Sequence, residues 1–262
     1  TLDAMSTAQA RRNDAVRPVR RLTQVLQVLL TVPLRTITGL RWLTWIAAGC
    51  HVAAAVLSWS WLPQVSWTWI AVGAVLLVTP PGRMVLAALA ARVLLRGVGP
   101  GTYPRGGGVH LRLWLAEHVA DELRAGSLSG ASLLGMYARV LGSRVARDVD
   151  LHSLPPVTGL LTVESGASVE PEVDLTGHWL DGDTLHVGSV RVGADARIGV
   201  RSLLAPGASI GARAEIGAGS AVFGDVPAGE YWSGAPARRN GPARGPQTDE
   251  RAERHVRWTV AY

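Results

Sequence analysis

An aliphatic residue recurs every six positions through the C-terminal half of the chain. The series is Val192, Ile198, Leu204, Ile210, Ile216 and Val222. The residue four places after each is small in nearly every case: Ala196, Ser202, Ala208, Ala214, Ser220, then Val226. A fixed short period predicts a solenoid, in which each six-residue unit forms one flat side of a triangular coil. The aliphatic residue would point inward and the small residue would fill the corner. Gly193 and Gly199, which follow aliphatic positions, would relieve backbone strain at the turn.

The same register runs through an earlier and less regular segment. Its aliphatic positions are Val145, Leu151, Val157, Val163, Val169 and Leu175. Leu175 and Val192 are 17 positions apart, one fewer than three hexads. We therefore expect Gly177–Val190 to bulge out of the coil or to slip its register. Six hexads on each side of this break, at three hexads per coil, predict about four coils.

Two amphipathic helices are expected between a Gly/Pro-rich linker at 99–108 and the first coil. His110–Gly126 carries an apolar stripe at helical spacing, made of Leu111, Trp114, Leu115, Val119 and Leu123. Glu117, Asp121 and Glu122 would face water on this helix. Ala131–Leu141 is the second helix, and it leads directly into the first hexad.

The N-terminal part of the chain has the pattern of a membrane hairpin. Leu22–Leu34 is expected to lie at the membrane interface as an amphipathic helix that Pro33 ends or kinks. Trp42–Leu62 has 21 residues without a charge and has Trp at both ends, which is typical of a membrane span. A buried core helix is the alternative. After a turn at Pro63–Ser66, a second apolar run reaches Thr79 and is short for a full span.

Two further details of this region are expected from its residues. The second apolar run either continues through a kink at Pro80 and Pro81, or it leads into an interfacial helix, which would be Met84–Leu95 with Arg92 and Arg96 on its wet side. His51, in the middle of the first span, would pack against a neighbouring helix.

Charge gives the hairpin an orientation. The chain has 26 Lys and Arg residues, a net charge of +6 and a pI near 10.6, values that would also suit a nucleic-acid-binding protein. Because the Arg residues cluster before the apolar segments rather than along one continuous patch, a membrane surface fits better. Arg precedes the hairpin and is absent from its turn, so both ends are expected on the cytoplasmic side of the cell membrane. The single Cys50 excludes a disulfide framework and a Cys-based metal site.

These patterns divide the chain into five regions. They are a basic cytoplasmic or interfacial segment (1–41), a transmembrane hairpin with an interfacial helix (42–97), a helical bridge (98–144), the coils (145–237) and a linker to a further membrane segment (238–262). The absence of an initial Met and the new apolar stretch at the end suggest a piece of a longer protein.

The hexads, with the lead-in Leu141–Val149 and the exit Pro227–Ala237, resemble the hexapeptide-repeat acyltransferase superfamily. This resemblance implies a mainly β fold, a left-handed parallel β-helix, preceded here by the α-helical hairpin and the two amphipathic helices. Periodicity alone gives no handedness, and parallel β crossovers are usually right-handed.

Four further stretches resemble the membrane-bound terminal region of poly-lysine-synthetase-like nonribosomal peptide synthetases. They are Gly101–Gly107, His110–Trp114, Leu151–Gly159 and Glu170–Asp183. The resemblance implies adenylation and carrier domains upstream, and three tandem soluble domains whose β-helices would form a pseudo-trimer. An aminoacyl thioester on the phosphopantetheine arm of a carrier would then be the acyl donor.

The resemblance also implies that a His acts as general base in acyl transfer, a task that suits a side chain with a pKa near 6.5. His178 is the first candidate, because it lies in the irregular segment with Asp181 and Asp183 nearby to orient it. His186 and His152 are the next candidates. Glu170, Glu172 and Asp174 would hold a cationic amine substrate. For each of these residues the alternative is a role in packing or on a solvated face.

Three functions therefore compete. The first is a segment of a membrane-embedded poly-amino-acid synthetase whose β-helix catalyses or supports amide bond formation. The second is a membrane-anchored acetyltransferase that uses acetyl-CoA. The third is a noncatalytic β-helix scaffold. No nucleic acid and no metal is expected in any of them.

Overall fold

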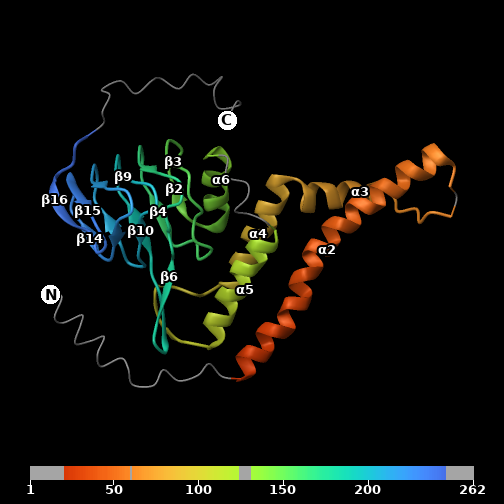
Figure 1. Cartoon of the computed structure of the whole chain (residues 1–262), viewed down its shortest axis with the longest axis horizontal. Helices are drawn as coiled ribbons and strands as arrows, with labels where there is room; N and C mark the ends of the chain where they lie inside the picture. The colour runs from red at the N-terminus through yellow and green to blue at the C-terminus, as the bar shows by residue number, and fades with distance from the viewer. Residues whose placement is uncertain (1–20, 60, 124–130, 246–262) are drawn as a thin grey trace.

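The computed structural model describes residues 21–59, 61–123 and 131–245. A β-helix and three short helices form one compact unit, and a long helical hairpin projects from it (Figure 1). The hairpin is formed by α2 (Arg21–Leu57) and α3 (Trp67–Gly73), the latter extended by a π-helix, η1 (Ala74–Val78). The three short helices are α4 (Pro80–Leu94), α5 (Gly108–Glu122) and α6 (Ala131–Leu141).

Parallel strands stack along the β-helix on three sides. The first side holds β2 (Arg144–Val145), β4 (Leu161–Val163), β8 (Val190–Val192), β11 (Ser209–Ile210) and β14 (Asp225–Val226) in spatial order. The second holds β3 (Asp150–Leu151), β5 (Ser168–Val169), β9 (Arg197–Ile198), β12 (Glu215–Ile216) and β15 (Glu230–Ser233). The third holds β10 (Leu203–Leu204) and β13 (Ala221–Val222). The parallel β-helix expected from the hexads is confirmed.

The coil count is higher than expected, because the first side has five strands. Val226, which the six-residue pattern assigned to a corner, is buried and pairs with Ile210 as an inward position of a further coil. The spacing between the inward positions Val222 and Val226 is therefore four residues instead of six. A strict six-residue pattern does not predict this extra inward position.

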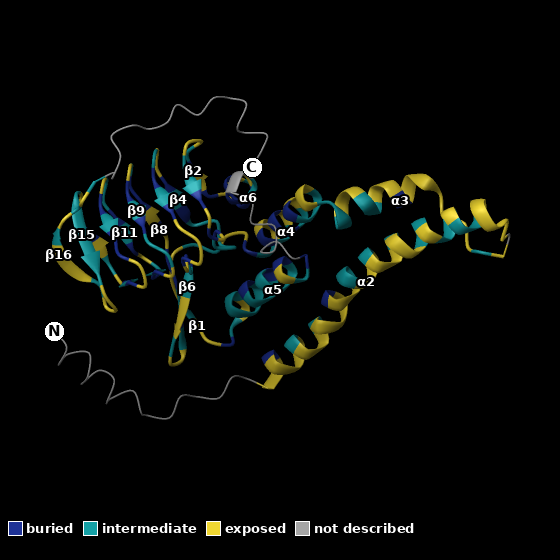
Figure 2. Cartoon of the chain, turned by 45° about the horizontal axis from the view of Figure 1, so that its top comes forward, coloured by how far each residue is buried: buried dark blue, intermediate teal, exposed yellow. Residues whose placement is uncertain are grey.

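The inward register is confirmed residue by residue. Val145 pairs with Val163, Val163 with Val192, and Val192 with Ile210. Each of the aliphatic hexad positions is buried except Val157, which is partly buried against the same core (Figure 2). Apolar burial of this kind contributes about 25 cal/mol per Å², so a continuous column of side chains stabilises every coil that it crosses.

The small corner residues Ala196, Ser202, Ala208, Ala214 and Ser220 are all buried. Gly193 and Gly199 were expected to relieve backbone strain at a turn, and this expectation is wrong. A Cβ on Gly193 would lie 2.7 Å from the backbone nitrogen of Ala212 in the next coil, so Gly is required by close approach. The backbone instead turns three residues after each inward position, where Asp195, Arg201 and Arg213 have φ near +58°.

The irregular segment bulges out of the coil as a β-hairpin of β6 (His178–Asp181) and β7 (Thr184–Val187). A two-residue turn at Gly182, with φ of +54°, joins the two strands. β7 also pairs with β1 (Gly101–Pro104) from the linker before α5, which makes a three-stranded antiparallel sheet. The coil resumes in register after the hairpin, so slippage, the alternative expectation, does not occur.

Helix α6 covers the open end of the first coil. Leu134 and Leu141 are buried, and the helix packs against β2 and β3. The expected apolar stripe of α5 is only partly confirmed. Leu123 is buried, but the other buried residues of this helix are Leu113, Ala116 and Ala120, whereas Trp114 and Val119 are half-buried. Helix α4 packs against α5 and α6 through Met84, Ala87, Ala88 and Ala91, and it exposes Leu89 and Val93 on its other side.

The long helix α2 runs through Pro33, so the expectation that the helix ends there is wrong. Proline costs the helix one hydrogen bond, but its fixed φ is compatible with helical geometry. By length and composition α2 is able to cross a membrane, and its most apolar window has a mean hydropathy of 1.4 with none of it buried. The second apolar run bends by 72° between η1 and α4, so it counts as a span only if that broken pair is taken as one.

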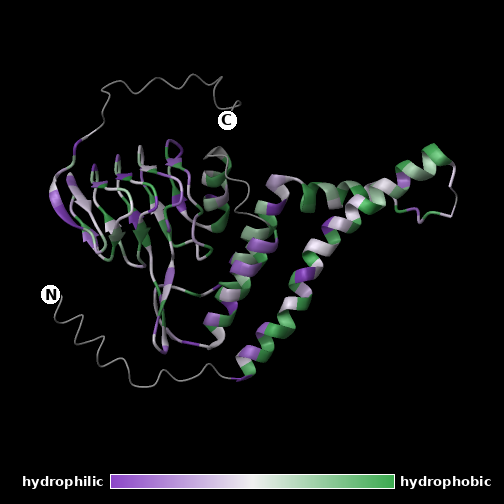
Figure 3. Cartoon of the chain, in the orientation of Figure 1, coloured by the Kyte–Doolittle hydropathy of each residue, from purple (hydrophilic) through white to green (hydrophobic). Residues whose placement is uncertain are grey.

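The two arms of the hairpin pack against each other and consist largely of hydrophobic residues (Figure 3), many of whose large side chains are exposed. The His51 ring stacks on Trp67 with centroids 4.7 Å apart, as expected for a residue packed against a neighbouring helix. The N-terminal half of α2 binds the helical bridge instead. Arg35 and Thr38 contact the Glu122 carboxylate on α5 at 2.9 Å and 2.6 Å.

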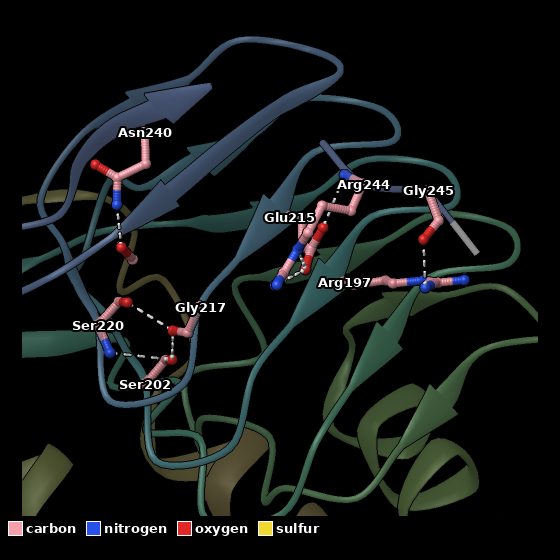
Figure 4. Close-up of polar contacts among 9 residues, drawn as sticks. Arg197, Ser202, Glu215, Gly217, Ser220, Asn240, Arg244 and Gly245 are labelled. Atoms are coloured by element: carbon pink, nitrogen blue, oxygen red, sulfur yellow. Dashed lines mark hydrogen bonds and ion pairs between the residues drawn. The ribbon is translucent and has the colours of Figure 1, made fainter. Parts of the chain in front are cut away.

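The last coil is closed by chain that was expected to be a linker. β16 (Arg238–Pro242) folds back antiparallel on β15, and Arg244 then forms an ion pair with Glu215 (Figure 4). The same view shows the hydroxyls of Ser202 and Ser220, which donate to the Gly217 carbonyl at 3.1 Å and 2.5 Å. Buried corner serines are thus satisfied by backbone groups.

The register makes a direct prediction about stability. Ile210→Asp places a carboxylate between Val192 and Val226 with no partner for its charge, and should cost several kcal/mol. Arg213→Asp changes an exposed position whose left-handed backbone Asp tolerates, and should alter stability by less than about 0.5 kcal/mol. Thermal melts compare the two variants, and equal melting temperatures would contradict the assigned register.

Candidate functional site

A cavity of about 670 Å³ lies where the third sides of the first two coils meet helices α5 and α6. It is lined by residues 152–158 and 171–178, together with Glu117 and Leu134. Ser153 fixes the shape of this wall from inside. Its buried hydroxyl donates to the Glu170 carbonyl at 2.7 Å and accepts from the Val173 N–H at 2.8 Å. These two bonds tie the lining segment of the first coil to that of the second coil.

Four of the predicted site residues line this cavity. They are His152, His178, Glu172 and Asp174. His152 directly follows the inward Leu151 and is exposed, with its backbone N–H bound to the Val169 carbonyl at 3.0 Å. His178 is half-buried at the point where the hairpin leaves the coil. Two histidines and two carboxylates that are up to 26 positions apart in sequence thus face one space.

The other predicted site residues lie elsewhere. The Glu170 carboxylate accepts from the Val200 N–H at 2.7 Å and so braces the next coil. His186 lies opposite Trp179 on the hairpin, with ring centroids 5.4 Å apart. Asp181 pairs with Thr184 next to the turn, where the Asp183 carbonyl accepts from Arg105 at 2.8 Å.

The geometry does not support the expected partnership of His178 with Asp181 or Asp183. Asp181 is three residues from His178 along one strand, so the two side chains point to opposite faces, roughly 10 Å apart along the chain. The carboxylate beside His178 belongs instead to Glu117 of α5, whose Oε1 lies 3.5 Å from Nδ1.

Glu117 was assigned to the water-facing side of its helix from sequence alone. Its side chain is 37% exposed, and that of His178 is 22% exposed. A signal was present in the spacing, because His110, Glu117 and Asp121 share one helical face at intervals of seven and four. Ionisable residues repeated along one face of a half-buried helix suggest a polar surface that meets another element.

Burial disfavours the charged forms of both Glu117 and His178. It raises the pKa of Glu117 to about 7, with a further contribution from the negative charge of Asp121. Burial also lowers the pKa of His178, with His110 acting in the same direction and Asp174 against it. His178 is therefore held as a neutral imidazole near neutral pH, which is the form able to accept a proton.

The two remaining acidic side chains of the cavity differ in their partners. Glu172 is bound by Arg201, whose Nε lies 2.6 Å from its carboxylate, so its charge is balanced. Asp174 accepts from the Thr176 hydroxyl and is exposed. Within the described parts of the chain, no group of three or more His, Cys, Asp and Glu residues is placed to hold a metal ion.

No protein-family model matches the chain. Over 160 residues it is 32% identical to Delta-poly-L-ornithine synthetase of Acinetobacter baumannii (strain AB307-0294). That alignment takes in 60% of this chain and 12% of the synthetase, so the chain spans about an eighth of its relative. The match confirms the resemblance to poly-amino-acid synthetases that the sequence motifs indicated.

Solved structures with some likeness are acetyltransferases. Serine acetyltransferase from Brucella abortus strain S19 is 14% identical, with a TM-score of 0.38, over 86% of this chain and 76% of its own. A galactoside acetyltransferase in complex with coenzyme A is also 14% identical, with a TM-score of 0.38, over 63% of this chain and 82% of its own. At these scores neither likeness carries an argument about function.

Glu117 gives folding a measurable pH dependence. Its carboxyl has a pKa of about 4.5 when unfolded and about 7 in the fold, so the folded state binds more protons between these values. Stability should therefore fall as the pH rises from about 4.5 to about 7. Glu117→Gln removes this loss and should raise the melting temperature relative to the parent chain at pH 8 but not at pH 4. A difference in melting temperature that stays constant over this range would contradict the assignment.

Proposed function

We propose that this β-helix is an acyl-transfer domain of a membrane-bound poly-amino-acid synthetase, in which it forms amide bonds between an aminoacyl thioester and an amine. The similarity to a poly-ornithine synthetase is the starting point. The observation that carries the proposal is the cavity itself, where a neutral, half-buried His178 lies beside acidic side chains.

The proposed reaction balances without a metal or an oxidant. His178 accepts a proton from the acceptor amine, whose nitrogen lone pair attacks the thioester carbonyl carbon. The tetrahedral intermediate collapses as the carbon–sulfur bond breaks, and the proton held by His178 passes to the leaving thiolate. The products are an amide and a free thiol, and general-base assistance of this kind contributes roughly 10²–10⁴ in rate.

The charge of the cavity favours a cationic acceptor. Asp174 lies on its wall and Glu117 on the facing helix, whereas the charge of Glu172 on the same wall is balanced by Arg201. A carboxylate attracts an ammonium group across a cavity of partly reduced dielectric more strongly than in bulk water. The acceptor we propose is a diamino acid, in agreement with the polymer named in the relative, and Asp174 would bind the amine that does not react.

The lining also favours one donor over another. Among the described residues that line the cavity, none is Arg or Lys. Coenzyme A carries phosphates that basic side chains usually bind, whereas a phosphopantetheine arm on a carrier domain leaves its phosphate at the carrier surface. Pro155, Pro156 and Leu154 offer an apolar wall to such an arm. We therefore prefer the carrier-bound thioester, with upstream adenylation and carrier domains as partners, over acetyl-CoA.

The proposed assembly follows from the family resemblance of the sequence motifs. Sister β-helix domains of the same polypeptide would complete a pseudo-trimer, so residues 97–240 alone should not form a stable trimer. Sedimentation of that segment as a homotrimer would favour the stand-alone acetyltransferase instead.

The base is tested in the complete membrane-bound protein. His178→Ala should cut amide formation by about 10²–10⁴ and leave amino-acid adenylation, an upstream step, unchanged. His186→Ala is the matched control on the same hairpin, and it should lower the rate less than about threefold. A loss below tenfold for His178→Ala would assign the base to another residue, and equal losses for both variants would indicate damage to the hairpin.

The proposed topology puts both ends of the helical hairpin of α2 and α3 on the cytoplasmic side, and the β-helix lies on the same side. Asn240 is exposed on β16 and is suitable for a cysteine probe once the only native cysteine, Cys50, is replaced. In sealed cells Asn240→Cys should resist a membrane-impermeant maleimide and should react after the cells are permeabilised. Labelling in intact cells would overturn this orientation.

A further inference from the structure

We infer that Glu117 is the positioning residue of the site, and that its charge decides which ring nitrogen of His178 is able to accept a proton. This inference rests on the proposed function, because it concerns the base used there. It places part of the machinery outside the β-helix, on a helix of the bridge that joins the β-helix to the membrane hairpin.

The geometry of the pair comes first. Glu117 Oε1 and His178 Nδ1 are 3.5 Å apart, and both residues line the cavity. This is slightly longer than a usual N–H···O hydrogen bond, and such contacts often tighten when substrate binds. Because Nδ1 is turned toward the carboxylate, Nε2 lies on the opposite side of the ring.

Both sides of this contact are held by several elements. The hairpin that carries His178 is paired with β1, and Arg105 beyond β1 donates to the carbonyls of Gly182 and Asp183 at its turn. Helix α5 is bound by Arg112 to the end of α4, with 2.6 Å to the Arg96 carbonyl, and by Glu122 to α2. The distance between Glu117 and His178 is thus set by packing on both sides, which is what a positioning contact needs.

The charge of Glu117 selects the tautomer of the neutral imidazole. An ionised carboxylate only accepts hydrogen bonds, so it favours the proton on Nδ1 and leaves a lone pair on Nε2. A protonated carboxyl donates to Nδ1 and favours the tautomer with Nε2–H, which is unable to act as a base through that nitrogen. The site is therefore competent when Glu117 is ionised and His178 is neutral.

The surroundings place this switch close to neutral pH. On its own helix Glu117 has Asp121 one turn away and His110 two turns away. The coils contribute His178 itself and Asp174, whose charge acts on His178. His152 and Glu172 line the same cavity, and Tyr137 on α6 interacts with Asp121. The pKa of Glu117 near 7 implies that the ionised fraction rises about tenfold between pH 6 and pH 8.

The test measures thiol release by the complete protein from an ornithinyl-pantetheine thioester with free ornithine as acceptor. Since the acceptor amine also titrates, the informative quantity is the ratio of parent to Glu117→Gln rates at each pH. This ratio should rise about tenfold from pH 6 to pH 8, because Gln is neutral throughout. Glu117→Asp should restore part of the pH dependence. Asp121→Asn removes a neighbouring negative charge, so it should move the rise in rate to lower pH.

A second readout does not depend on activity. The ¹⁵N shifts of His178, assigned by comparison with His178→Ala, report its tautomer directly. They should change near pH 7 in the parent chain and remain constant over that range in Glu117→Gln. Equal melting temperatures of the two chains at pH 4 would show that the amide variant is folded.

The outcomes separate this inference from the proposed function. If His178→Ala has no effect on the rate, the proposed base is wrong. If His178→Ala abolishes thiol release while the ratio of parent to Glu117→Gln rates stays constant with pH, only the role of Glu117 is overturned. A His178 tautomer that titrates identically in both chains would overturn it as well.

Discussion

The stacking of one aliphatic side chain on the next, coil after coil, is the interaction on which the rest of this structure depends. Each inward residue is buried only because its equivalents lie above and below it, as Ile198 lies between Val169 and Ile216. A single coil would leave its inward side chains exposed, so the stability of the fold comes from the contacts between neighbouring coils. This explains why the six-residue spacing is kept so strictly and why additional chain leaves the coil at a corner.

A stack of this kind has two open ends, and the chain covers both. Helix α6 lies over the first coil with Leu134 and Leu141 buried, while β16 folds back along the last strand of the other end. Exposed strand edges and apolar coil interiors invite association with other chains. The hairpin of β6 and β7 is a different kind of addition, because it connects a corner to the helical bridge through β1.

Helix α5 connects three parts of the molecule. One face carries Glu122, which is bound by Arg35 and Thr38 of the long apolar helix. Another face of α5 carries Glu117, which lies beside His178 at the cavity. Its N-terminal end follows β1, the strand that pairs with the hairpin. The apolar helix and the candidate site therefore both contact α5.

The sequence alone determined the features of the coils that depend on the six-residue period. The inward register, most corner residues, the position of the break and the presence of an apolar hairpin follow from spacings of six residues or from runs of uncharged residues. His152, His178, Glu172 and Asp174 were named from the sequence one by one, but their position around one cavity depends on how the coils meet helices α5 and α6.

Only the tertiary structure decided the features in which distant segments meet. Glu117 and His178 are 61 positions apart, and no period links a helix of the bridge to a hairpin of the coil. The same holds for β1 beside β7 and for Arg35 beside Glu122. Val226 departs from the strict period for a related reason: the last coil has a shortened side, and only the packing of Val226 against Ile210 shows that this side is part of the coil. Repeating patterns record which face of an element is buried, whereas the partner of that face is chosen by the free energy of the whole fold.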